Sequence, residues 1–126
     1  MVERGKFITF EGGELVGKTT QVQLLVNFFR KLGIRVEASR EPGGVYTAEK
    51  IRQIIMEDKA GPLAQVFLFN AARVEFIKNF LQPTLNSGTT VISDRFADST
   101  IVYQGIVQRV PLEQVMFIVK AAIEDL

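Results

Sequence analysis

The fold is decided by the stretch Phe7-Ile8-Thr9-Phe10-Glu11-Gly12-Gly13-Glu14-Leu15-Val16-Gly17-Lys18-Thr19-Thr20. Its first four residues are apolar or β-branched, which predicts a short buried strand that ends at the glycines. Residues 12–19 fit the pattern G-x-x-x-x-G-K-[ST], and apolar residues recur at helical spacing from 18 to 32. A strand, this glycine pattern and a helix, in that order, predict a phosphate-binding P-loop.

The chemistry of a P-loop explains its residue types. Glycines let the backbone curl around a phosphate chain, whose charge then faces backbone N–H groups and the helix N-terminus. We expect Lys18 to reach the β and γ phosphates of ATP and the Thr19 hydroxyl to ligate Mg²⁺. The alternative is a chance glycine turn before a helix, which the correctly placed strand and helix disfavour. The expected nucleotide-binding residues are Gly12, Gly13, Glu14, Leu15, Val16, Gly17, Lys18, Thr19 and Thr20.

The rest of the chain alternates between strand and helix patterns. Further strands are expected at residues 34–38 and 89–93, and helices at 47–56, at 62–80, around 99–104, and from 111 to the last residue, 126. Pro83 is expected to kink or divide the second of these helices. The alternation predicts an α/β fold, with a parallel sheet and crossover helices, in a single domain.

Asp94 directly follows the strand expected at 89–93. Ligands bind at the carboxyl ends of the strands in such sheets, and a carboxylate placed there can hold Mg²⁺. A strand-end cap or an ion pair is the alternative role for this side chain. The P-loop beside it favours the metal-binding interpretation, with Thr19 and Asp94 as the expected Mg²⁺ ligands.

Composition excludes several kinds of chemistry. The 126 residues contain no cysteine and no histidine, which removes disulfides, thiol catalysis and a histidine base. The net charge of +1 gives no strong field for nucleic acid or an anionic membrane. No apolar run is long enough to span a membrane, and the polar N-terminus does not match a signal peptide. These features predict a cytoplasmic protein that binds neither nucleic acid nor membrane.

Further motifs follow the P-loop in a fixed order. They are Arg40-Glu41-Pro42-Gly43-Gly44, then Leu68-Phe69 with Ala71 and Arg73, then Asp94-Arg95-Phe96, and then Asp98-Ser99-Thr100 with Tyr103-Gln104-Gly105. In this order and spacing the chain resembles bacterial thymidylate kinase over essentially its whole length. The resemblance implies transfer of the γ-phosphate of ATP to dTMP, giving dTDP, with Mg²⁺. It also implies a five-stranded parallel sheet and a homodimer.

The resemblance assigns roles to the acceptor residues by position. Phe69 stands where an aromatic ring stacks on thymine, with core packing as the alternative. Arg73, one helical turn further on, would reach the edge of the base, with a solvated helix charge as the alternative. Tyr103 would pack under the deoxyribose and disfavour a 2′-hydroxyl. The remaining residues implied for the acceptor pocket are Arg40, Ser99, Thr100 and Gln104.

The same resemblance implies a catalytic set of Lys18, Arg95 and Glu14. Arg95 matches an arginine that clamps the transferring phosphates, a bidentate task that suits guanidinium. Glu14 matches an acidic P-loop residue that approaches the acceptor sugar and the metal. The sequence departs from the family pattern at Leu15, Val45 and Phe96, and the bulky Leu15 must point away from the phosphates.

The resemblance also places a lid with catalytic arginines, and two further strands, beyond residue 126. The chain is therefore expected to be the N-terminal part of a kinase domain. Its last helix is expected to need a sheet to cover its apolar stripe, and the strand at 7–10 to lie exposed at the sheet edge. Two alternatives remain: a kinase for another deoxynucleotide, and a truncated nucleotide-binding remnant that catalyses nothing.

Overall fold

The computed structural model describes residues 2–126 as one α/β unit. Its elements, in chain order, are β1 (Phe7–Phe10), α1 (Lys18–Lys31), β2 (Val36–Arg40), α2 (Tyr46–Met56), α3 (Pro62–Phe76), a π-helical turn (Ile77–Leu81), α4 (Gln82–Asn86), β3 (Thr90–Asp94), α5 (Ala97–Thr100), a second π-helical segment (Ile101–Val107) and α6 (Leu112–Ile123). No helix within residues 2–126 combines the length and the apolar character needed to cross a bilayer.

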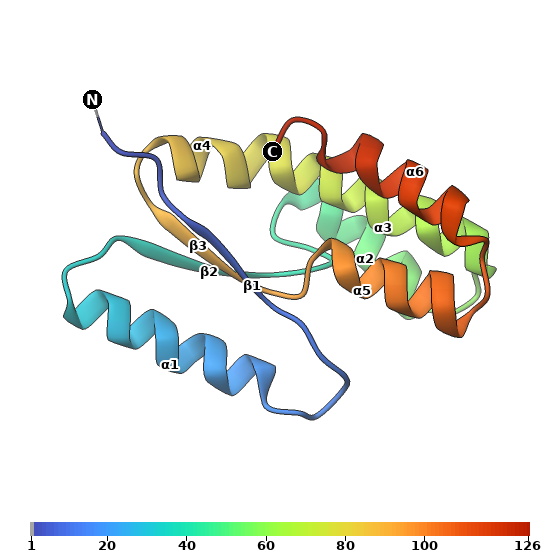
Figure 1. The fold of residues 1–126 in the computed structure, drawn as a ribbon, viewed down its shortest axis with the longest axis horizontal. Helices are drawn as coiled ribbons and strands as arrows, with labels where there is room; N and C mark the ends of the chain where they lie inside the picture. The colour runs from blue at the N-terminus through green and yellow to red at the C-terminus, as the bar shows by residue number, and fades with distance from the viewer. Residues whose placement is uncertain (1) are drawn as a thin grey trace.

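The three strands form one parallel sheet in the order β1-β3-β2 (Figure 1). The register places Phe10, Asp94 and Arg40 in one row at the carboxyl ends of the strands. The central strand β3 is buried from Thr90 to Ser93, whereas β1 is only partly buried. The prediction of a buried first strand was therefore wrong in its burial. Within the described residues β1 pairs on one side only, as expected for an edge strand.

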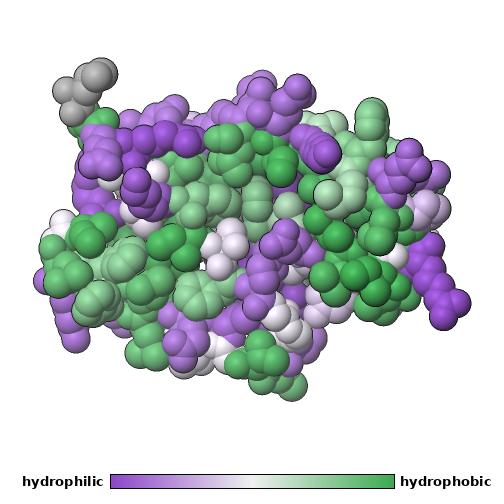
Figure 2. Space-filling view, viewed as in Figure 1, coloured by the Kyte–Doolittle hydropathy of each residue, from purple (hydrophilic) through white to green (hydrophobic). Residues whose placement is uncertain are grey.

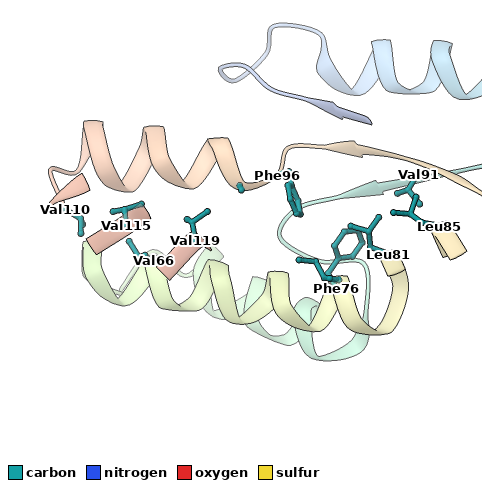
Figure 3. Packing of buried hydrophobic residues seen from close by; sticks show 11 residues of the cluster. Val66, Phe76, Leu81, Leu85, Val91, Phe96, Val110, Val115 and Val119 are labelled. Atoms are coloured by element: carbon teal, nitrogen blue, oxygen red, sulfur yellow. The ribbon is translucent and has the colours of Figure 1, made fainter. Parts of the chain in front are cut away.

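Helices cover both faces of the sheet, with α1 on one face and α3 and α4 on the other, and α6 packs on α3 (Figure 1). On the α1 side, Val22 and Val26 pack against Val36 and Ile92. The larger cluster on the opposite face includes Phe76, Leu81 and Leu85 with Val91, and Val66, Val115 and Val119 lie between α3 and α6 (Figure 3). This arrangement fixes β3 from both faces, and with β3 it fixes the start of the loop that follows Asp94.

The last helix differs from its prediction in two ways. It ends at Ile123, so the prediction that it runs to Leu126 was wrong. Its apolar stripe was expected to need a sheet, but Val115 and Val119 are buried against α3 instead. Helix-on-helix packing covers such a stripe as effectively as a sheet does.

Other boundaries shift by a few residues. The strand predicted at 34–38 is β2, Val36–Arg40, because Gly33 at φ 75° ends the preceding helix and the Ile34 N–H still bonds the Phe29 carbonyl oxygen. Pro83 does not divide the long helix: it lies in the first turn of α4, which follows the π-helical turn without a break.

Hydrophobic side chains gather on the outer surface of α1, at the lower left in Figure 2. Leu24, Phe28 and Leu32 are each more than half exposed there. These side chains lie on the side of α1 that faces away from the sheet, while Val22 and Val26 face the core. Helix α1 therefore carries apolar side chains on its exposed face as well as on the face that the sheet buries.

Candidate active site

The P-loop connects β1 to α1, as its sequence predicts. Gly17 adopts φ 95° immediately before α1 begins at Lys18. A side chain at Gly17 would be strained in this left-handed conformation, whatever the space around it. The Lys18 Nζ donates a 2.6 Å hydrogen bond to the Gly13 carbonyl oxygen, which keeps the ammonium over its own loop.

The side chain of Leu15 is fully exposed, and Leu15 is among the residues that line the cavity at the P-loop. Its backbone adopts φ 56°, a left-handed conformation that costs about 1–2 kcal/mol for a residue other than glycine.

Thr19 and Asp94 meet at the start of α1 and the end of β3. The Thr19 hydroxyl donates a 2.7 Å hydrogen bond to Asp94 Oδ2. A hydroxyl and a carboxylate are oxygen ligands of the kind that Mg²⁺ prefers. No group of three or more acidic, histidine or cysteine side chains that could hold a metal occurs within residues 2–126. The Thr19 hydroxyl beside the Asp94 carboxylate fits Mg²⁺, which usually keeps several waters and binds through one or two carboxylates plus phosphate oxygens.

Arg95 follows β3 and links the P-loop to α5. It adopts φ 72° and donates a 2.8 Å hydrogen bond to Glu14 Oε1 and a 3.2 Å hydrogen bond to the Ser99 hydroxyl. Its guanidinium carbon lies 5.2 Å from the centroid of the Tyr103 ring, a cation–π arrangement. Glu14 is mostly exposed, so this ion pair is open to solvent on one side. The geometry brings three residues of the predicted site into contact around one guanidinium.

Glu11, directly after β1, forms hydrogen bonds with the residues that follow Arg95. Its two carboxylate oxygens accept hydrogen bonds from the Phe96 N–H at 2.8 Å and from the Ser99 hydroxyl at 2.7 Å. The sequence analysis gave Glu11 no role, although it is part of the quoted motif. The carboxylate ties the first residues after β1 to the loop after β3.

Arg73 is buried, with only 1% of its surface exposed. The alternative of a solvated helix charge is therefore wrong. Its Nε and Nη2 donate 2.9 Å hydrogen bonds to the two oxygens of Glu41, and its Nη1 donates to Asn70 Oδ1 at 2.6 Å. Nη2 also donates to the Thr100 hydroxyl at 3.0 Å, and the guanidinium lies over the Phe96 ring. Helix α3, the loop after β2 and α5 all contribute to this network.

The Glu41 carboxyl is buried with its partner. Burial raises its pKa above the usual value, and the charge and hydrogen bonds of Arg73 oppose this rise in part. An isolated carboxylate in such a place would be strongly disfavoured. Pairing with the Arg73 guanidinium therefore stabilises the charged form of the Glu41 carboxyl group in this buried position.

Two cavities open at the carboxyl end of the sheet. The smaller, about 400 Å³, is lined by Glu14 to Thr20 together with Asp94 and Arg95. The larger, about 660 Å³, lies between the loop after β2, α2, α3 and α5 with the helical segment that follows it. Both cavities are lined by Glu14, Thr19, Asp94 and Arg95. The P-loop cavity and the larger cavity thus meet at one set of charged and hydroxyl side chains.

The larger cavity brings together every residue expected for the acceptor: Arg40, Phe69, Arg73, Ser99, Thr100, Tyr103 and Gln104. In the smaller cavity lie the expected P-loop residues from Glu14 to Thr20, while Gly12 and Gly13 are outside its lining. The cavity is also lined by residues that were not expected there, including Glu41, Arg52, Gln65, Phe96 and Gln108. Glu41 and Phe96 belong to the motifs quoted from the sequence, so their motifs already pointed to a place in the site. Arg52 and Gln65 lie on predicted helices and carry no local signal.

The amides in this wall form a small network. Gln65 Oε1 accepts from Gln108 Nε2 at 3.0 Å and from Gln104 Nε2 at 3.3 Å. Gln104 is 3% exposed, and its Oε1 is a buried acceptor without a hydrogen-bond partner among the described residues. A buried amide oxygen of this kind is normally satisfied by a ligand or by water.

Comparison with known proteins agrees with this geometry. The family model described as thymidylate kinase matches residues 10–124. Thymidylate kinase of Bartonella quintana is 51% identical over 105 residues, covering 81% of this chain and 49% of that protein. For Dehalococcoides mccartyi thymidylate kinase the identity is 44%, covering 86% of this chain and 54% of that protein.

A solved structure is also similar. The crystal structure of thymidylate kinase from Ehrlichia chaffeensis superposes with a TM-score of 0.88 at 34% identity, over 94% of this chain and 68% of that chain. The chain spans about half the length of the relatives from Bartonella and Dehalococcoides. The matches nevertheless run through the P-loop, both cavities and α6, and on this evidence the chain belongs to the thymidylate kinase family.

Proposed function

We propose that this chain forms the nucleotide- and acceptor-binding part of an enzyme that transfers the γ-phosphate of ATP to dTMP, giving dTDP. The observation that carries the proposal is the shared wall of the two cavities. A donor held by the P-loop and an acceptor in the larger cavity would meet at Glu14, Thr19, Asp94 and Arg95. Direct transfer requires such a meeting point, because the attacking and leaving oxygens must lie roughly in line.

On the donor side, Lys18 would turn from the Gly13 carbonyl oxygen to the β and γ phosphates. Thr19 and Asp94 would hold Mg²⁺, which supplies charge neutralisation to the phosphates when it is bound. An oxygen of the dTMP phosphate forms the new bond to the γ-phosphorus, and the bond from that phosphorus to the bridging oxygen of ADP breaks. Arg95 lies at the junction and is positioned to donate to the phosphates of both nucleotides.

On the acceptor side, the half-buried ring of Phe69 in the cavity wall would stack on the base. Arg73 has one Nη1 hydrogen left after its other donors are counted, and Gln104 Oε1 is an acceptor without a partner. Thymine presents a carbonyl oxygen beside an N–H on one edge, so a donor and an acceptor in one cavity match it. Tyr103, whose ring lies against Arg95, would pack under the sugar.

We further propose that the protein acts in the cytoplasm as a homodimer. Leu63, Phe67 and Val74 lie on one side of α3, and each is more than 40% exposed. Phe117 of α6 is 76% exposed as well. Exposed aromatic and aliphatic side chains on neighbouring helices support a helix-to-helix interface between two copies.

The test is ADP release in a coupled assay with MgATP and dTMP, with AMP and UMP as competing acceptors. We expect turnover with dTMP well above that with either alternative, from the chain or from any longer product of the same gene. Equal use of dTMP and AMP would refute the proposed acceptor.

A nucleotide-binding protein without turnover is the second candidate. It is favoured by the share of its relatives that the chain spans, about half. Calorimetric binding of both ATP and dTMP with no ADP release from the chain would identify it.

A further inference from the structure

Glu41 is the one buried carboxyl group among the described residues whose pKa is shifted, and the reaction outlined above does not use it. It begins the loop after β2 and lies in the wall of the larger cavity. Both of its oxygens accept hydrogen bonds from Arg73, on Nε at 2.9 and 3.2 Å and on Nη2 at 2.9 Å. Its contacts are therefore directed at the arginine side chain.

The hydrogen-bond donors of Arg73 can be counted. A guanidinium has five N–H groups in a fixed planar fork. Glu41 occupies the Nε–H and one Nη2–H, Thr100 occupies the other Nη2–H, and Asn70 occupies one Nη1–H. One Nη1–H is left on a side chain that lines the cavity. The plane is fixed as well, because the guanidinium carbon lies 5.3 Å from the centroid of the Phe96 ring.

A bidentate carboxylate determines how an arginine fork is rotated about its long axis. Without Glu41, the Nε and Nη2 groups of Arg73 would bond to other acceptors. The guanidinium could then rotate, and the remaining Nη1–H would lose its fixed direction. Stability alone does not explain such a pair, because apolar residues of similar size often stabilise a core as well as a buried ion pair does. A fixed donor in a binding cavity is a use that apolar residues cannot supply.

We propose that Glu41 is a positioning residue for the acceptor base: it orients Arg73 so that a single N–H group is presented to a carbonyl oxygen on the ligand. The inference rests on the proposed function, because that function places a keto pyrimidine in the larger cavity. Glu41 itself makes no contact with the ligand in this arrangement. Its effect on the acceptor passes through Arg73.

The experiment measures dTMP and ATP dissociation constants by calorimetry for wild type, Glu41→Gln, Arg73→Gln and the double variant. Glu41→Gln keeps the shape of the side chain and one carbonyl acceptor but removes the charge. We expect its dissociation constant for dTMP to rise about ten-fold or more, as expected for a lost charged hydrogen bond, while that for ATP stays within about two-fold. In the Arg73→Gln background, Glu41→Gln should change dTMP binding little, because the two residues act as one unit.

The control is Glu37→Gln, which removes an exposed carboxylate from β2, the strand that precedes Glu41. We expect it to bind both nucleotides as wild type does. Glu41→Asp keeps the charge on a shorter side chain and is expected to weaken dTMP binding less than Glu41→Gln. It provides the test if Glu41→Gln does not fold.

Three outcomes would overturn the proposal. Unchanged dTMP binding in a folded Glu41→Gln or Glu41→Asp variant would show that Arg73 needs no orientation. Equal weakening of dTMP and ATP would indicate a general structural defect. Failure of the wild-type chain to bind dTMP at all would refute the proposed acceptor and the inference with it. If the wild type binds dTMP and the variants bind it equally well, only the inference about Glu41 is refuted.

Discussion

Replacement of Arg73 by methionine tests whether the Glu41–Arg73 pair is buried and charged. Methionine fills much of the volume of the arginine stem but offers no donor. The variant leaves Glu41, whose oxygens accept 2.9 Å bonds from Arg73 in the native protein, without its counter-charge. Both side chains are at most 5% exposed, so water cannot replace the lost bonds without local opening.

The size of the effect follows from this geometry. Removing one partner of a buried ion pair typically costs about 3–5 kcal/mol. Such a loss is a large fraction of the roughly 5–15 kcal/mol that stabilises a typical domain. It corresponds to a fall in melting temperature of roughly 10–20 °C for a domain of this size.

The pH dependence has a definite sign. Burial raises the pKa of Glu41 in the folded state, and Arg73 partly opposes that rise. When folding raises a pKa, the group favours folding below the unfolded-state pKa, and this contribution is lost as pH rises through the folded-state pKa. In Arg73→Met the opposing influence is gone, so the pKa of Glu41 rises further. The variant should therefore lose more free energy of unfolding at about pH 8 than at about pH 5.

The assay is urea unfolding followed by far-UV circular dichroism, since the chain has no tryptophan to report by fluorescence. The control Arg30→Met removes an exposed arginine from α1 and should change stability by no more than about 0.5 kcal/mol. Adding Glu41→Gln to Arg73→Met should recover part of the loss, because it removes the orphaned charge. A loss below about 1 kcal/mol that is the same at both pH values would refute a buried, charged pair.

Further predictions concern the reaction. Lys18→Ala should remove most phosphoryl transfer in a coupled ADP-release assay, since it deletes the ammonium set against the β and γ phosphates; an unchanged rate would disprove the P-loop assignment. Asp94→Asn should raise the Mg²⁺ concentration needed for half-maximal ATP binding in calorimetry, because a carboxylate ligand becomes a neutral amide, and an identical Mg²⁺ titration would contradict this. Arg73→Ala should weaken dTMP binding by about 1–3 kcal/mol in a folded sample, with ATP binding nearly unchanged.

Much of the fold could be predicted because its signals are local. The P-loop motif lies between β1 and α1, and Asp94 ends β3, as periodicity and turn residues indicate. The burial of β1 was predicted wrongly, because strand composition does not reveal how many neighbours a strand has. The predicted packing of α6 was wrong as well. An apolar stripe indicates that one face of a helix is buried, but it does not indicate which element buries that face. The π-helical turn at Ile77–Leu81 was not predicted.

The candidate site was predicted residue by residue, but its contacts were not. Arg73 was expected to face either a ligand or solvent, and the structure pairs it with Glu41, 32 positions earlier in the chain. No sequence period links two such residues, because their contact depends on how α3 packs beside the end of β2. The same holds for Gln65 and Gln104, which meet across two helical segments.

The row formed by Phe10, Asp94 and Arg40 has a consequence for how the protein can change in length. The P-loop, the loop at Arg95 and the loop at Glu41 all leave the sheet immediately after this row, and the Arg95 and Glu41 N–H groups still bond the carbonyl oxygens of Phe10 and Asp94. One residue gained or lost inside any strand would shift that loop along the sheet and turn its side chains to the opposite face. The connection between α2 and α3, residues 57–61, sets no such register and can absorb a length change. We therefore expect changes in chain length in connections such as residues 57–61, whereas the lengths of the three strands fix the positions of the functional groups.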